Sequence, residues 1–165
     1  MLRLSLCIFY VVFFLCSAPL RAEPSVVPAP FVAPLMQWVA VRMSVPVTSL
    51  PTVYISRERM IAKIGDPMRQ SALARALYVP NEVVIDDEFW DASDTRTVSF
   101  LVHELVHHAQ LVSGRSYSCH KAKEWEAYKL QNMWLAEHGL PPAVEDKWIA
   151  RMADCNLPTI IQRLH

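Results

Sequence analysis

The chain has 165 residues, of which 53% are hydrophobic and 19% charged, and its 16 basic residues balance 16 acidic ones. This length suits a single domain. The balanced charge, without a cluster of lysine and arginine, excludes the basic surface that nucleic-acid binding needs. So apolar a chain can bury a core, which excludes a disordered tail protein.

The first 22 residues have the layout of a secretory signal peptide, with Arg3 ahead of an apolar run from Leu4 to Cys16 and then the small residues Ser17, Ala18 and Ala22. Cleavage is expected after Ala22. The run of about 13 residues is shorter than the roughly 20 of a membrane-spanning helix, so no stable span is expected after cleavage, with an uncleaved anchor as the alternative. The mature chain, with 14 basic and 16 acidic residues, is expected to be secreted or periplasmic.

Two of the four cysteines, Cys7 and Cys16, leave with the signal peptide. The remaining pair, Cys119 and Cys155, is predicted to form a disulfide, because an oxidising export compartment favours one. Metal ligation is the alternative, but these cysteines lack the CxxC spacing and the cysteine-rich neighbours of thiolate zinc sites.

Residues 23–34 are rich in proline and are predicted to be an extended lead-in, which places the folded domain at residues 35–165. Apolar periodicity and runs of β-branched residues predict the elements that follow. These are a helix at Leu35–Met43, a strand at Thr52–Ser56, a helix at Arg57–Ile64 capped by Ser56 and closed by Gly65, and a hairpin of Ala74–Val79 and Glu82–Asp86.

The second half of the chain is predicted to be helical. Asp94 caps an amphipathic helix that runs to Ser113 and stops at Gly114. Two more helices are expected, at Lys121–His138 and Ala143–Ala153. The order of elements predicts an α+β fold, in which a small sheet containing the hairpin packs against the first two of these helices.

Two further expectations concern packing. The hairpin residues Val83, Val84 and Ile85 are predicted to form a sheet edge that can hold an extended peptide by main-chain hydrogen bonds. The tryptophans of the C-terminal helices, at spacings that suit packing, are predicted to be core residues; they are Trp125, Trp134 and Trp148.

The Asp94 helix contains the sequence HELVH, from His103 to His107. A spacing of four residues places both imidazoles on one face of a helix, about one turn apart, where two nitrogens can bind one zinc ion. Glu104 is next to the first histidine and can take a proton from a water on the metal without being a ligand. The motif therefore predicts a zinc site with Glu104 as the general base.

A catalytic zinc needs a third protein ligand, and the next helix offers Glu124 and Glu126. Residues two apart point to different sides of a helix, so only one of them is expected to ligate. Glu124 is preferred, because the small Ala127 on its face allows the two helices to approach closely. Glu126 remains an alternative ligand or the partner of a surface lysine, and His120 is a further alternative.

This pattern resembles the gluzincin class of zinc metallopeptidases, in which HExxH is followed on the next helix by a glutamate and, three residues later, a small residue. The resemblance covers residues 94–138 and implies zinc held by His103, His107 and Glu124. Gluzincins usually have aspartate where this chain has Tyr128, as the partner of the first histidine, so the group that orients His103 is open. The whole chain also resembles small, exported bacterial HExxH proteins.

The other polar candidates are assigned lesser roles. His108 points about 100 degrees away from His107 around the helix and is predicted to be a capped or surface histidine. The extended motif of histidine-rich zincins is absent, since Gln110 and Ser113 occupy its positions. Tyr117 and Tyr128 are candidates to bind a developing oxyanion, although a core or surface role is the simpler interpretation for each.

The expected function is zinc-dependent hydrolysis of a peptide bond in a peptide or protein substrate. The alternative is a zinc-containing binding or regulatory module without proteolytic activity. A third possibility is an amidase or esterase that acts on cell-wall material by the same chemistry.

Overall fold

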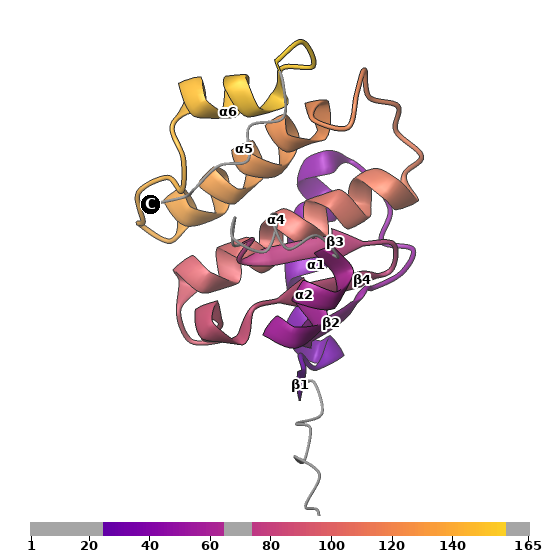
Figure 1. Ribbon diagram of the computed structural model, residues 1–165, viewed down its shortest axis with the longest axis vertical. Helices are drawn as coiled ribbons and strands as arrows, with labels where there is room; N and C mark the ends of the chain where they lie inside the picture. The colour runs from indigo at the N-terminus through magenta and orange to yellow at the C-terminus, as the bar shows by residue number, and fades with distance from the viewer. Residues whose placement is uncertain (1–24, 65–73, 158–165) are drawn as a thin grey trace, which may run out of the picture.

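A computed structural model describes residues 25–64 and 74–157, which form five α-helices and a four-stranded mixed sheet (Figure 1). The predicted α+β class is therefore confirmed. The elements, in chain order, are β1 (Ser25–Val26), α1 (Ala29–Met43), β2 (Thr52–Ile55), α2 (Arg57–Ile64), β3 (Ala76–Val79), β4 (Glu82–Ile85), the 3-10 turn η1 (Asp87–Phe89), α4 (Thr95–Val112), α5 (Ala122–Glu137) and α6 (Asp146–Ala153). The predicted signal peptide and Gly65 lie outside the described residues.

The proline-rich segment is part of the fold, and the prediction of an extended lead-in is wrong beyond its first residues. Helix α1 begins at Ala29, with Pro28 as N-cap and Pro30 in the first turn. Proline is well tolerated there, because its fixed φ suits a helix and the first N–H groups have no partner within the helix. Pro34 lies inside α1, yet Val32 and Met36 on either side of it are buried in the core. Burial of this apolar face offsets the lost hydrogen bond.

The sheet has the strand order β1-β2-β4-β3, with β2 and β4 parallel and the other two pairs antiparallel. The predicted β3–β4 hairpin is confirmed, and its turn residue Asn81 has a φ of 66°. Strand β4 lies in the middle of the sheet, and its residues Val83, Val84 and Ile85 are fully buried. The prediction that these residues form a sheet edge is therefore wrong, and β3 is the edge strand on that side.

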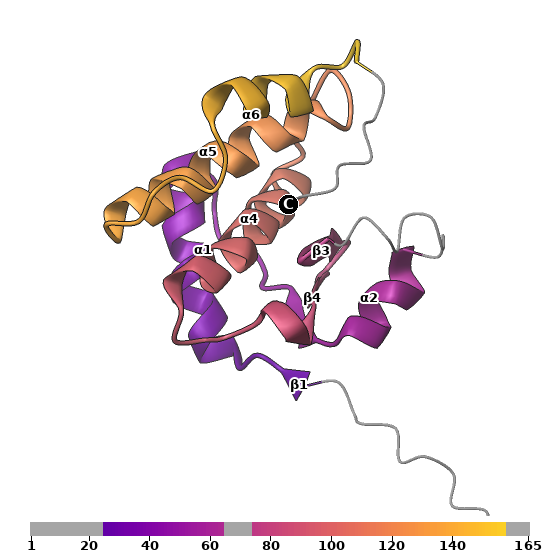
Figure 2. The same cartoon turned by 60° about the vertical axis from the view of Figure 1, so that its left-hand side comes forward.

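Helix α4 lies in the middle of the fold (Figure 2). It contacts α5 on one side, and it contacts α1, β3 and β4 elsewhere on its surface. It is capped as predicted, since the Asp94 carboxylate accepts a 2.8 Å hydrogen bond from the N–H of Arg96. Its buried stripe includes Leu101, Leu105 and Ala109 and joins the core formed with α1 and the strands. The helix that carries the HELVH motif is thus fixed by packing on both sides.

The C-terminal helices α5 and α6 pack on each other and cover the α4 side away from the sheet (Figures 1 and 2). The predicted disulfide is confirmed, because Cys119 and Cys155 are joined with Cα atoms 5.9 Å apart. The two cysteines are 36 residues apart in the sequence. By loop-closure entropy, a bridge across such a loop stabilises the folded state by roughly 3–4 kcal/mol. It ties the start of α5 to the segment that follows α6.

The tryptophans behave differently from one another. Trp134 packs against the core and meets Trp38 edge to face, as predicted. Trp148 is half-buried against Tyr128. Trp125 is 46% exposed, so its predicted core role is wrong; its ring lies beneath the ammonium of Lys129 on the solvent side of α5. Among the described residues, no helix combines the length and apolar character required to span a membrane.

Candidate metal centre

The two histidines of HELVH lie where the helical spacing places them, one turn apart on the face of α4 that meets α5. The Nε2 atoms of His103 and His107 are 3.2 Å apart, and their rings meet edge to face with centroids separated by 4.9 Å. His103 is buried and His107 half-buried. Two ring nitrogens therefore converge on one point beside α5.

Glu124, in the first turn of α5, completes the cluster. Its Oε2 lies 3.3 Å from the Nε2 of His103, and its Oε1 lies 3.5 Å from the Nε2 of His107. Ligands about 2.0–2.1 Å from a tetrahedral zinc ion are about 3.3–3.4 Å from one another. The spacings of 3.2, 3.3 and 3.5 Å fit that geometry, and these residues form a group that could hold a metal ion.

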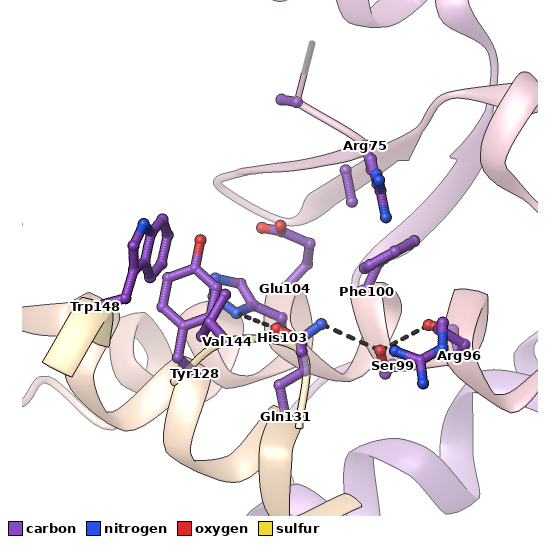
Figure 3. Close-up of a pocket in the computed structure, with 13 residues that line it drawn as sticks. Arg75, Arg96, Ser99, Phe100, His103, Glu104, Tyr128, Gln131, Val144 and Trp148 are labelled. Carbon is purple, nitrogen blue, oxygen red and sulfur yellow. Dashed lines mark hydrogen bonds between the residues drawn. The ribbon is translucent and has the colours of Figure 1, made fainter. Parts of the chain in front are cut away.

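The orientation of His103 is set by a chain of hydrogen bonds (Figure 3). The Ser99 hydroxyl donates to the carbonyl of Arg96 at 2.7 Å, so its oxygen accepts from the Gln131 amide nitrogen at 3.1 Å. The Gln131 amide oxygen therefore faces the Nδ1 of His103, 3.1 Å away. This network assigns the proton of His103 to Nδ1 and leaves its Nε2 lone pair free for a metal.

His107 is oriented in the same way from within α4. The amide nitrogen of Gln110 donates to the carbonyl of Lys123 at 3.0 Å and to the Glu126 carboxylate at 3.2 Å. The amide oxygen of Gln110 then accepts from the Nδ1 of His107 at 2.9 Å. The Nε2 lone pairs of both histidines thus face each other and the Glu124 carboxylate, an arrangement that needs a cation or a proton between them.

The charges of the metal-free site agree with this interpretation. Burial acts to lower the pKa of His107, but the hydrogen bond to Glu124 and the charges of Glu104 and Glu124 raise it to about 9. Burial acts to raise the pKa of Glu124, but its contacts with His103 and His107 hold that pKa well below the usual range. In the absence of metal, a proton shared among these groups supplies the positive charge that the cluster requires.

Glu104 projects from α4 toward β3 and is not a member of the three-residue cluster (Figure 3). Its side chain is buried. Desolvation raises its pKa, opposed by the charges of His103 and His107. A buried carboxylate whose proton affinity is raised, next to a candidate metal site, has the character of a general base or acid.

Glu126 does not join the cluster, so the structure does not favour it as the third ligand. Its carboxylate pairs with Arg115 at 2.8 Å and accepts hydrogen bonds from Gln110 and Tyr117. The predicted alternative of a lysine partner is wrong, since the partner is an arginine. The Tyr117 hydroxyl donates to Glu126, and burial together with that hydrogen bond and the charge of Glu126 raises the pKa of Tyr117 to about 12. His120 is exposed and outside the cluster.

Tyr128 lies over His103, with ring centroids 4.4 Å apart, and is supported from behind by Trp148. Burial and the charges of Glu124 and Glu104 raise the pKa of Tyr128, so its hydroxyl stays protonated and can donate. Tyr128 does not take the place of the aspartate that gluzincins have at this position. The orienting group of His103 is Gln131 instead.

His108 is fully buried, so of the two predicted roles, a capped or a surface histidine, the surface role is wrong. Its Nδ1 lies 3.2 Å from the Tyr78 hydroxyl, and its Nε2 lies 3.2 Å from both the hydroxyl and the carbonyl oxygen of Ser49. The residue therefore links α4 to β3 and to the loop before β2. Burial lowers its pKa, which keeps the imidazole neutral.

Sequence reasoning did not identify the two glutamines that orient the histidines. Gln131 follows Glu124 by seven residues, two helical turns, and therefore shares its face of α5. Gln110 follows His107 by three residues on α4. A search for amides at such spacings on the ligand-bearing faces would have found both.

Two hollows meet at this site, and His103, Glu104 and Tyr128 line both of them. One, of about 400 Å³, lies over His107 and Glu124 and is bordered by β3 residues, including Leu77. The other, of about 260 Å³, extends from Glu104 toward the start of α4. Open space thus lies on both sides of Glu104.

The molecule is therefore an α+β domain with a candidate metal centre formed by two neighbouring helices. Residues 24–161 match the family described as a domain of unknown function (DUF6647), and the chain belongs to that family. The match includes the proline-rich segment, in agreement with the inclusion of α1 in the fold. No curated protein and no solved structure gives a significant match to the chain.

Proposed function

We propose that the protein is a zinc-dependent hydrolase, and specifically a metallopeptidase in which His103, His107 and Glu124 hold the ion. The observation that carries this proposal is the fixed orientation of both imidazoles, whose Nε2 lone pairs converge with the Glu124 carboxylate at the spacing of tetrahedral ligands. Two imidazoles and one carboxylate are a ligand set of catalytic zinc sites. When bound, the ion would act as a Lewis acid and make a water molecule a stronger nucleophile at neutral pH.

Glu104 is the proposed general base. Its carboxylate is buried beside the ligands but is not one of them, so it is free to accept a proton from the attacking water and pass it to the leaving amine. A purely structural zinc site would have no use for a buried carboxylate at this position. Tyr128 supports the same reaction, because its hydroxyl is protonated and can donate to a negatively charged oxygen.

Strand β3 is the proposed site for the substrate main chain. It pairs only with β4 among the described residues, so its other side has no strand partner in that part of the chain. Ala76 of β3 lines both hollows around Glu104, and Leu77 and Tyr78 line the larger one. An extended peptide that adds to such an edge gains main-chain hydrogen bonds. This assigns to β3 the role that the sequence had suggested for Val83–Ile85.

A secreted or periplasmic location belongs to the same proposal. The signal-like sequence at the N-terminus and the disulfide between Cys119 and Cys155 support it, because disulfides persist mainly in oxidising compartments.

The deciding experiment compares zinc-loaded wild type with Glu104→Gln on a broad peptide library. The variant should keep stoichiometric zinc and its melting temperature but lose about 10²–10⁴-fold in kcat, the usual contribution of a general base. Glu145→Gln makes the same chemical change at an exposed position and is the matched control. A wild type that binds zinc and cleaves no peptide or cell-wall substrate would instead indicate a binding or regulatory module.

A further inference from the structure

The smaller hollow has a chemical character that the proposed reaction does not use. Its lining comes from α4, from the chain at the start of β3, and from α5 and α6. In Figure 3, Tyr128 and Trp148 lie on one side of Glu104, whereas Arg75, Phe100 and Arg96 lie on the other. The hollow therefore has an aromatic half and a cationic half, with the proposed base between them.

The cationic half is formed by two arginines that come from separate elements. Arg75 immediately precedes β3, and its guanidinium lies 5.1 Å from the centroid of the Phe100 ring and 5.2 Å from that of Phe89. Arg96 is in the first turn of α4. Both are half-buried, and both line the hollow together with Glu104. A guanidinium group that lies over an aromatic ring keeps its positive charge, and its N–H groups can still donate hydrogen bonds.

Neither arginine has a carboxylate partner within 4.0 Å among residues 25–64 and 74–157. Glu88 and Asp91, which share an adjoining shallow hollow with them, are engaged elsewhere. Glu88 pairs with Arg57, and Asp91 accepts hydrogen bonds from Ser93. The two guanidinium groups are thus available to an anion that enters beside Glu104.

We infer that this cationic half receives a carboxylate of the substrate residue next to the bond that is cleaved. The inference rests on the proposed hydrolase function and specifies its substrate class. A guanidinium group matches the planar geometry of a carboxylate and can donate several charge-assisted hydrogen bonds to it. The Phe100 ring, which lies between Arg75 and Arg96 in Figure 3, offers apolar surface to the methylene groups of an acidic side chain. The volume of about 260 Å³ suits one residue.

The carboxylate has two possible sources, a side chain or the C-terminal end of the substrate, and three small probes distinguish them. N-acetylglutamate α-amide carries only the side-chain carboxylate. N-acetylglutamine carries only the terminal one, and N-acetylglutamine α-amide carries neither. Binding of each to zinc-loaded wild type is measured by calorimetry or by NMR titration, without any need for turnover.

One or both of the charged probes should bind at least about tenfold more tightly than the neutral one, since a hydrogen bond to a charged group contributes this much or more. Arg96→Gln should abolish the preference, and Arg96→Lys should restore part of it. Arg151→Gln removes the same charge from an exposed position on α6 and should leave the preference intact. Equal binding of all three probes to wild type, or a preference that survives in Arg96→Gln, would overturn the inference.

Failure of this inference is distinguishable from failure of the proposed function. A protein that cleaves peptides with equal kcat/KM for acidic and neutral residues beside the scissile bond would be a peptidase without a carboxylate pocket. A protein that prefers the charged probes but cleaves nothing would retain the pocket and lose the proposed function.

Discussion

His107 and His108 are adjacent in the sequence but lie on different sides of α4, and their pKa values shift in opposite directions. His107 faces α5, where Gln110 and Glu124 surround it with hydrogen-bonding and charged groups, and its pKa rises to about 9 in the absence of metal. His108 faces the sheet, where Tyr78 and Ser49 are neutral partners, and burial lowers its pKa. Neighbours along the chain thus differ because the helix turns them toward different surroundings.

The comparison shows that a buried histidine is no sign of a metal site by itself. On the α5 side, each ring donates from Nδ1 and turns a free lone pair toward a carboxylate. On the sheet side, the Tyr78 hydroxyl accepts from the N–H of Asn81 and donates to the Nδ1 of His108, while the Nε2 of His108 donates to Ser49. Both nitrogens of His108 are thus used within the protein, and none is left for an ion.

The largest effect is expected from the ligand on α5. Glu124→Ala removes one of the three proposed ligands and should weaken zinc binding by more than the roughly 10–100-fold that loss of an orienting residue costs. Glu126→Ala should keep stoichiometric zinc, because Glu126 is outside the three-residue cluster and contacts the residues that orient it only through Gln110. Metal analysis of both purified variants, with a competing chelator, gives the affinities. Retention of zinc by Glu124→Ala would contradict the assigned ligand set.

Next in size is the effect of the sheet-side histidine on stability. His108→Ala leaves a cavity and two unpaired polar groups and should lower the free energy of unfolding by about 2–3 kcal/mol. It should leave zinc affinity nearly unchanged, whereas His107→Ala should abolish zinc binding. Urea denaturation of the chelator-treated proteins and zinc titration separate the two roles. Loss of zinc affinity in a folded His108→Ala protein would show that the two sides are not independent.

A smaller effect is expected from Gln131, which orients His103 from α5. Gln131→Ala should reduce zinc affinity by about 10–100-fold, equivalent to about 1.4–2.7 kcal/mol, because His103 loses the group that holds its tautomer. The bound stoichiometry should remain one. Asn132→Ala, the neighbouring residue on α5, is a control with its side chain directed at the α5–α6 connection. If the two variants bind zinc equally well, Gln131 has no orienting role.

In the zinc-free protein, His107 and His108 should change the free energy of unfolding with pH in opposite directions. Because the folded pKa of His108 is lowered, its unfolded form takes up a proton first, and stability falls as the pH drops below about 6.5. The contribution of His107 is complete below about 6.5 and is lost as the pH rises through about 9. Each slope is at most about 1.4 kcal/mol per pH unit.

Denaturant titrations between about pH 5 and pH 10, with chelator present, measure both slopes. His108→Gln should remove only the acid-side slope and His107→Gln only the alkaline one. A single slope abolished by both substitutions would mean that the two rings titrate as one unit.

Sequence alone predicted the parts of the site that a helix determines locally. The four-residue spacing of HELVH places His103 and His107 on one face whatever surrounds the helix, and Ala127 correctly indicated close approach of the face that carries Glu124. The disulfide followed from the small number of cysteines. These inferences needed no knowledge of how distant segments pack.

The errors concern long-range packing. The position of β4 in the middle of the sheet depends on its parallel pairing with β2, thirty residues earlier in the chain, which no local pattern reveals. The burial of His108 depends on the arrival of Tyr78 and Ser49 from other segments. Helix α1 was predicted too short because proline was read as a helix breaker, although tertiary burial around Pro34 outweighs that preference.

The bridge between Cys119 and Cys155 has a consequence for when the metal centre matures. Cys119 precedes Glu124 by five residues, so the cross-link holds the segment that leads into the first turn of α5, where this proposed ligand lies. A newly made chain with free thiols lacks that anchor and should capture zinc less firmly than the oxidised form, which zinc titration with and without a reductant can measure. Formation of the disulfide would then precede firm zinc binding at this candidate site.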